Sequence, residues 1–301
     1  TLPKPTELLH QWRPSTEVRE RGLGTSGIFN SQTWLERTPI RPAAAWAVVA
    51  GLLASGFLAR PFDIGWPTLV ILFLLTDPLW SGIWRLAAGR SEILPLHEVE
   101  GRTVTLPYLQ PDSPAAQLLD RNSGRVLPVL IRVGFPSVLL ALIVASAIGM
   151  VAVGFTLLVA TLASLGWIAT RRRHQLPVLL FSIVSIGLPW LLTAWMLLGS
   201  AGSVVESWQW ILICLWVLHG WGAGRIIRFR NERFGLLLMA MADIGILLCL
   251  IGLMAPLWLA FWLVFTLPVW ILVYRGTFAG NIEFWHLGAM LVSAAAVGWM
   301  P

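Results

Sequence analysis

The sequence predicts an all-α polytopic integral membrane protein with about nine transmembrane helices. Three observations lead to this prediction. Of the 301 residues, 57% are hydrophobic and only 12% are charged, which is about half the charged share of a typical soluble domain. Long apolar stretches follow one another through the chain. Basic residues gather in alternate loops, as they do on the cytoplasmic side of multi-pass proteins.

The apolar stretches define the predicted helices, each close to the roughly 20 residues that cross the hydrocarbon of a bilayer. Helices are expected rather than a β-barrel, because the stretches show no period of two. The interruptions between neighbouring apolar stretches are shortest at Gly149 and at Ala255-Pro256. The predicted spans are 43–61, 65–89, 127–147, 149–170, 175–199, 207–224, 234–253, 255–274 and 282–300.

The basic residues predict a cytoplasmic N-terminus. In that orientation every Lys and Arg except Arg60 lies on the cytoplasmic side, so the C-terminus is expected to be periplasmic or extracellular. Residues 1–42 form a polar cytoplasmic arm, residues 43–301 form the transmembrane domain, and a cytoplasmic loop occupies about 90–126. The expected location is the inner membrane of a bacterial-type cell.

The net charge of +6 does not indicate nucleic-acid binding, because the arginines flank apolar spans and no recognition motif accompanies them. Anionic lipid headgroups are the expected partners of these side chains. The group after the sixth span is the strongest predicted anion or headgroup site, and it comprises Arg225, Arg228 and Arg230.

Ionisable side chains inside the spans carry most of the functional information, since each is costly in hydrocarbon and needs a partner. Asp77, Arg132, His219 and His286 fall in the predicted cytoplasmic half, which suggests one ligand-binding region there. An alternative is that Asp77 and Arg132 form a structural ion pair. Asp243 falls at a different predicted depth, and we expect it to hydrogen-bond a neighbouring helix.

His219 is followed by small residues that include Gly220 and Gly222. These could leave open volume beside the imidazole for a tetrapyrrole whose metal the ring nitrogen binds. His286, which follows Trp285, is a second possible axial ligand, and a haem held by both histidines is allowed. The same glycines would also suit close helix packing without a ligand. Expected ligands are (bacterio)chlorophyll, haem, carotenoid or quinone.

The layout resembles the intramembrane prenyltransferases of the UbiA type, which include quinone-pathway enzymes and chlorophyll synthases. The resemblance implies nine helices and two cytoplasmic regions, after the second and sixth helices, whose acidic residues hold Mg²⁺ and a prenyl diphosphate. The matching positions here are Asp77, Ser81 and Arg85 in the second span and Glu232 after the sixth. The acidic motifs are therefore degenerate, although arginines could hold a phosphate directly.

These observations lead us to expect a non-catalytic membrane subunit of a larger photosynthetic or respiratory complex. It would hold a pigment, quinone or lipid in its cytoplasmic half and would have other membrane subunits as partners. An alternative is a prenyltransferase that uses Asp77, Arg85, Glu232 and Mg²⁺. A transporter ranks third, because the sequence shows no internal repeat and almost no ionisable group in the periplasmic half.

Overall fold

The computed structural model describes residues 44–57, 65–87, 134–173, 177–199, 207–229, 233–275 and 281–299, and these ranges are helical apart from short turns. The expectations for the N-terminal arm, for the loop at 90–126, and for Arg60 and Arg132 fall outside the described residues. Every predicted span contains a described helical segment. The all-α prediction is therefore confirmed for the described part of the chain.

Several helices have the length and composition of membrane spans. Four helical runs are long and apolar enough to cross a bilayer, namely 66–84, 178–197, 233–252 and 256–274. Shorter apolar helices cover 44–54, 135–148, 150–166 and 284–298. These properties indicate a membrane protein. The helical elements are α4 (Ala44–Ala54), α5 (Trp66–Leu74), η1 (Leu75–Trp80), α6 (Ser81–Ala87), α9 (Phe135–Ile148), α10 (Met150–Arg173), α11 (Val178–Ser182), η5 (Ile183–Gly187), α12 (Leu188–Gly199), α13 (Ser207–Phe229), α14 (Arg233–Gly252), α15 (Pro256–Tyr274) and α16 (Asn281–Gly298).

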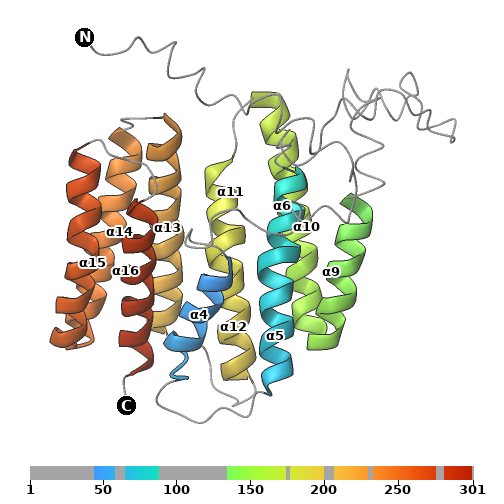
Figure 1. Ribbon diagram of the computed structural model, residues 1–301, viewed down its shortest axis with the longest axis horizontal. Coiled ribbons are helices and arrows are strands. Elements are labelled where there is room, and N and C mark those ends of the chain that lie inside the picture. Colours follow the sequence, from blue (N-terminus) through green and yellow to red (C-terminus); the bar gives the residue numbers. More distant parts are fainter. Residues whose placement is uncertain are drawn as a thin grey trace, which may run out of the picture.

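The helices stand side by side, and successive helical runs point in alternating directions (Figure 1). Helices α5, α6, α9 and α10, which we call the N-terminal half, lie on one side of the picture. Helices α13 to α16, which we call the C-terminal unit, lie on the other, with α4 and the run from α11 to α12 between them. The first described helix packs against the last, because a Cβ on Gly56 would come within 3.0 Å of the Gly298 carbonyl oxygen.

Two turns confirm the thinnest predicted boundaries. Gly149 separates α9 from α10 and has a φ of 145°. Residues other than glycine rarely adopt this backbone conformation. Met254, with a φ of 50°, turns the chain between α14 and α15. Pro256 then begins α15, where its missing N–H costs no helical hydrogen bond.

Prolines explain the two π-helical segments. η1 contains Pro78, and η5 ends just before Leu188 and Pro189. Proline has no N–H and its ring crowds the carbonyl four residues earlier, so the helix widens by a local π turn and continues. Both runs therefore remain long enough to cross a membrane.

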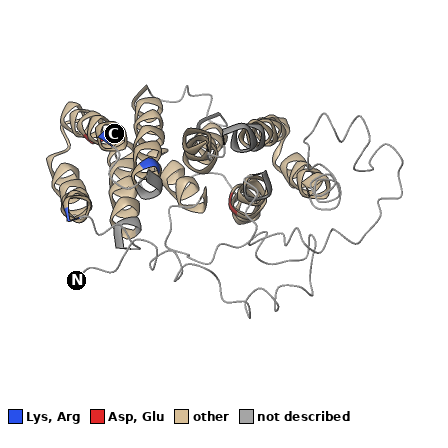
Figure 2. Ribbon diagram, turned by 90° about the horizontal axis from the view of Figure 1, so that it is seen from above, with Lys and Arg blue, Asp and Glu red and all other residues tan. Residues whose placement is uncertain are grey.

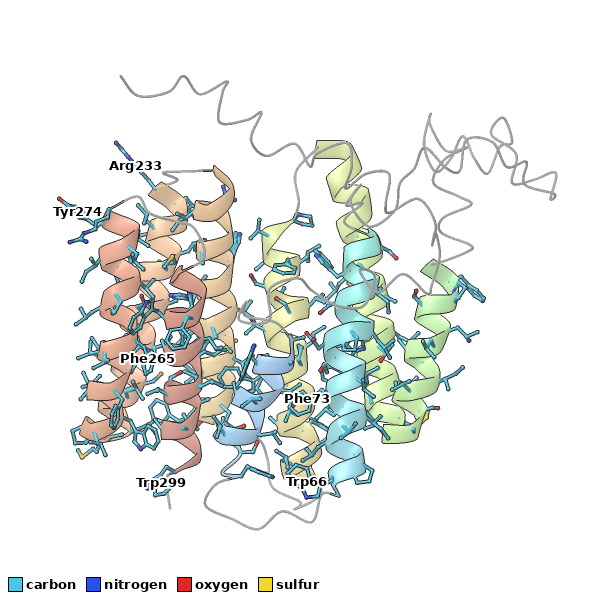
Figure 3. The ribbon with its side chains drawn as sticks, viewed as in Figure 1. Trp66, Phe73, Arg233, Phe265, Tyr274 and Trp299 are labelled. Atoms are coloured by element: carbon cyan, nitrogen blue, oxygen red, sulfur yellow. The ribbon has the colours of Figure 1, made fainter. Side chains whose placement is uncertain are left out.

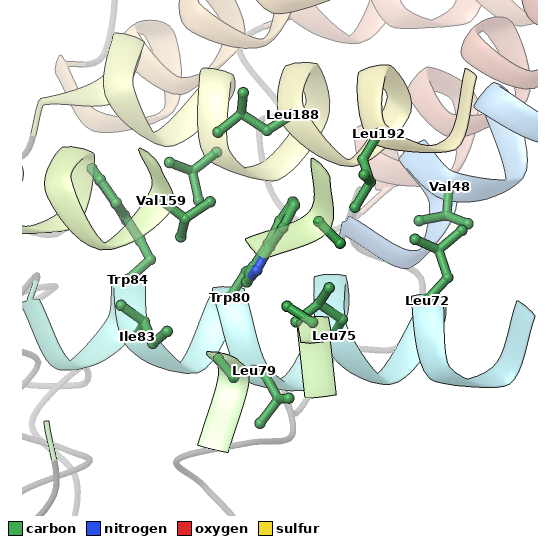
Figure 4. Packing of buried hydrophobic residues seen from close by; sticks show 14 of the residues in the cluster. Val48, Leu72, Leu75, Leu79, Trp80, Ile83, Trp84, Val159, Leu188 and Leu192 are labelled. Carbon is green, nitrogen blue, oxygen red and sulfur yellow. The ribbon is translucent and has the colours of Figure 1, made fainter. Parts of the chain in front are cut away.

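Two main hydrophobic clusters hold the helices together. The first joins the N-terminal half to α4 and to the run from α11 to α12, and it is centred on Leu75 and Trp80, both fully buried (Figure 4). Trp80 Nε1 donates a 3.1 Å hydrogen bond to Thr156 Oγ1, which satisfies the indole inside the cluster. The second cluster joins α4 and α12 to the C-terminal unit.

Few residues of the described helices are Lys, Arg, Asp or Glu (Figure 2), and many of their exposed side chains are large and apolar. Arg233 and Tyr274 lie at one end of the bundle, whereas Trp66 and Trp299 lie at the other (Figure 3). Helix α15 is the least buried of the four membrane-length runs. An apolar belt of this kind is typical of helices in contact with lipid or with other membrane subunits. On α14 and α15 it includes Leu237, Met241, Ile244, Leu248, Ile251, Leu257, Phe261, Val264, Leu267 and Ile271.

Candidate functional site

A chain of three buried ionisable side chains crosses the interior of the C-terminal unit. His219 of α13, Asp243 of α14 and His286 of α16 are 2%, 7% and 9% exposed. His219 Nε2 lies 3.2 Å from Asp243 Oδ1, and His219 Nδ1 contacts His286 Nε2. We call this arrangement the Asp-His-His chain. It links three helices. Each of these side chains would be unfavourable in free energy if it lay in hydrocarbon without a partner.

Two tryptophans enclose the Asp-His-His chain. Trp270 of α15 donates a 2.7 Å hydrogen bond from Nε1 to Asp243 Oδ2, so α15 also contributes to the site. The ring centroid of Trp216 lies 5.0 Å from that of His219 and 6.0 Å from that of His286. Trp216 Nε1 donates to Ser293 Oγ at 2.9 Å. The indoles therefore shield the polar groups while their own N–H groups are satisfied.

The predicted difference in depth between Asp243 and the histidines is wrong. Asp243 contacts His219 directly, because α13 continues to Phe229, five residues past the predicted end of the sixth span. His219 and Asp243 consequently both lie near the middle of their helices. Helix α16 begins lower in the bundle than its neighbours (Figure 1), and this brings His286 to the same level. The expected hydrogen bond from Asp243 to a neighbouring helix is confirmed.

The open volume expected beside His219 is filled by neighbouring helices. A Cβ on Gly220 would come within 2.7 Å of Ile186 Cδ1, and one on Gly222 within 2.7 Å of the Gly235 carbonyl oxygen. These glycines therefore allow α13 to pack closely against η5 and α14. Both ring nitrogens of His219 already have partners. Axial ligation of a metal by either histidine stays a prediction, and the contact between the two rings occupies the place that a haem between them would need.

Other predicted site residues lie apart from the Asp-His-His chain. Asp77 is half-buried in η1, in the other half of the bundle, so the single polar region expected for Asp77 and the histidines is not formed. Arg225 places its guanidinium 5.2 Å from the ring centroid of Phe234. Trp285 packs against Phe265, with 5.9 Å between the ring centroids. Glu232 and Arg230 lie outside the described residues, as do the side chains of Arg85 and Arg228.

Two further polar side chains of the C-terminal unit are buried on α15, and one of them, Thr266, was missed by the sequence reasoning. Trp262 and Thr266 of α15 are 2% and 6% exposed, and neither Trp262 Nε1 nor Thr266 Oγ1 has a hydrogen-bond partner within the described ranges. Buried donors of this kind are rare, because each costs about 1 to 3 kcal/mol when unpaired. Their spacing of four residues was visible in the sequence, but their inward direction was not.

The described residues contain no group of three or more His, Cys, Asp or Glu side chains arranged to hold a metal ion. What the C-terminal unit offers instead is a small set of buried polar side chains inside an apolar helical bundle: the Asp-His-His chain, Trp262 and Thr266. Comparisons of the chain with protein-family models, with curated proteins and with solved structures found no match.

Proposed function

We propose that this protein is a non-catalytic, multi-pass membrane subunit that holds a large hydrophobic ligand inside its C-terminal unit. The observation that carries the proposal is the coexistence of a satisfied Asp-His-His chain with two buried, unpaired polar side chains, Trp262 and Thr266. Small-molecule sites combine apolar walls with a few convergent polar groups. The C-terminal unit has both features.

Several properties support membership of a larger complex in a bacterial-type inner membrane. The exposed faces of α14 and α15 are apolar along their length, so they suit lipid or neighbouring transmembrane helices equally well. The proposed partners are subunits of a photosynthetic or respiratory assembly, and the proposed ligands are a quinone, a pigment or a lipid. The N-terminus would face the cytoplasm, as the distribution of basic residues predicts.

The prenyltransferase alternative gains no support from the arrangement of the helices. Its two predicted motif regions begin on η1, which carries Asp77, and on α13, which precedes Glu232. η1 belongs to the first hydrophobic cluster and α13 to the second. Among the described residues, the buried ionisable side chains that contact one another, His219, Asp243 and His286, lie on α13, α14 and α16 instead.

The proposal is tested by identifying what the protein retains after gentle purification. The full chain is extracted from its native membrane with a mild detergent or a membrane-solubilising polymer. Bound lipophiles are then measured by native mass spectrometry and by absorption spectroscopy. We expect a hydrophobic ligand in stoichiometric amount, together with partner subunits. A folded protein that retains neither ligand nor partner would contradict the proposal.

A further inference from the structure

We propose that an anionic phospholipid binds on the exposed face of α14, with its phosphate held by Arg225 and Arg233 and an acyl chain along the helix. This inference concerns the outer surface of the bundle and does not depend on the ligand proposed above. It rests on two arginines beside an exposed aromatic ring, on the net positive charge of the adjoining sequence, and on an apolar stripe that begins at that ring.

The exposed ring is that of Phe234, which is 44% exposed at the start of α14. The Arg225 guanidinium of α13 lies 5.2 Å from the centroid of this ring, where the ring face attracts a cation. Trp221 of α13 packs edge-on against the same ring, with 5.7 Å between the centroids. Arg233 directly precedes Phe234, is exposed, and points away from the bundle (Figure 3). Two helices therefore each bring one arginine to this end of α14.

The sequence around these two arginines is complementary in charge to an anionic headgroup. Residues 225–233 contain four arginines and one glutamate, a net charge of +3. A guanidinium can bind phosphate oxygens through two N–H groups at once, and basic segments at a membrane surface attract anionic lipids. A zwitterionic headgroup carries a positive charge of its own, which the arginines would repel. The charge of this segment therefore favours an anionic phospholipid.

An apolar stripe continues from Phe234 along the exposed face of α14. Every exposed residue of α14 from Phe234 to Ile251 is large and apolar, and spacings of three and four residues place these side chains on one face. A rise of about 15 Å separates Phe234 from Ile244, which matches one leaflet, or half of the roughly 30 Å hydrocarbon thickness. One acyl chain can therefore lie along the stripe while its phosphate reaches the arginines. The stripe comprises Phe234, Leu237, Met241, Ile244, Leu248 and Ile251.

Hydropathy alone would allow another transmembrane helix to cover this stripe, but its composition favours a lipid. Contacts between transmembrane helices are enriched in small residues, because these let the two backbones approach closely. Such residues do occur on the exposed face of α10, where Gly154, Thr161 and Ser164 lie. The stripe on α14 has none, and its basic end suits a phosphate. We therefore assign this face to a phospholipid.

The experiment measures lipid affinity by native mass spectrometry of the full chain in detergent, after removal of bound lipid. The probes are phosphatidylglycerol and phosphatidylcholine with the same acyl chains. We expect phosphatidylglycerol to bind about tenfold more tightly. Arg225→Gln and Arg233→Gln each remove one charge and should each weaken phosphatidylglycerol binding by about fivefold. Binding of phosphatidylcholine should stay the same.

Two controls separate this site from general charge attraction and from a site for free anions. Arg275→Gln removes the same charge from an exposed position next to Tyr274, at the same end of the bundle (Figure 3), and should leave phosphatidylglycerol affinity unchanged. Excess inorganic phosphate lacks an acyl chain and should not displace the lipid. Each variant is compared only after it elutes as the unmodified protein does.

A photo-reactive residue tests what covers the stripe in the native membrane. Met241 is 54% exposed, so p-benzoylphenylalanine at position 241 should form an adduct of lipid mass on illumination. An adduct with another protein would overturn the inference. Equal affinity for the two lipids, unchanged affinity in either arginine variant, an equal loss in Arg275→Gln, or displacement by inorganic phosphate would each overturn it as well.

Discussion

Asp243 illustrates how one buried carboxylate organises several helices. Its Oδ2 atom accepts a hydrogen bond from Trp270 Nε1, and its Oδ1 atom lies near His219 Nε2. His219 in turn contacts His286. Removing the carboxylate would leave these groups unpaired in an apolar interior, where each unpaired group costs about 1 to 3 kcal/mol. The Asp-His-His chain is therefore a specific structural link between α13, α14 and α16.

Two substitutions of Asp243 should separate the effect of its side-chain shape on stability from the effect of its hydrogen bonds. Asp243→Asn keeps an acceptor for Trp270 and supplies an N–H donor to His219, so we expect it to cost less than about 1 kcal/mol of unfolding free energy. Asp243→Leu leaves both partners unpaired and should cost about 2 to 3 kcal/mol. Thermal unfolding in detergent, followed by tryptophan fluorescence, measures the difference. Equal stability of the two variants would contradict this account.

At the scale of elements, glycines set how closely α13 and α14 approach. Gly222 faces the backbone of Gly235, and Gly235 in turn faces the Gly222 carbonyl oxygen. This reciprocal contact brings His219 and Asp243 within reach of each other. Gly222 was predicted to provide space for a ligand, because a sequence cannot distinguish a glycine facing a cavity from one facing a neighbouring helix.

Alanine substitutions of two helical glycines test this packing. Gly222→Ala places a Cβ against the Gly235 carbonyl oxygen and the Met239 backbone nitrogen of α14. These backbone atoms cannot move aside as a flexible side chain can, so the variant should cost about 1 to 3 kcal/mol. Gly154→Ala on α10 is the matched control, since nothing lies within 4 Å of its Cβ position. That variant should be unchanged or more stable by up to about 1 kcal/mol, because alanine is the better helix former. A stability ranking in the opposite order would refute the packing argument.

At the scale of the whole molecule, successive helical runs point in opposite directions. Each end of the bundle is therefore expected to face one side of the membrane. Tyr274 and Arg233 share one end, and Trp299 lies at the other (Figure 3). The distribution of basic residues predicts that the first end faces the cytoplasm. Aromatic side chains at helix ends suit the interface between hydrocarbon and water, where their rings anchor the helices.

Cysteine labelling tests the proposed orientation. Cys214 and Cys249 are first replaced by alanine, and single cysteines are then introduced as Tyr274→Cys and Trp299→Cys, two positions that are 93% and 59% exposed. In right-side-out spheroplasts a membrane-impermeant maleimide should label position 299 and spare position 274. Inside-out vesicles should give the opposite result. The reverse pattern would invert the proposed topology.

The sequence by itself determined the membrane class, the approximate helical ranges and the boundaries at Gly149 and Ala255-Pro256, because hydropathy and backbone preference are local properties. It also singled out the two histidines and Asp77 as members of one polar region and Asp243 as a residue that hydrogen-bonds a neighbouring helix. Only the tertiary structure decided that these three touch, that Asp77 lies elsewhere, and that the glycines beside His219 pack against other helices. Those outcomes depend on where each helix ends, how far it is shifted along its axis and which face it turns inward. A single sequence does not specify these quantities, because they arise from packing among helices far apart in the chain.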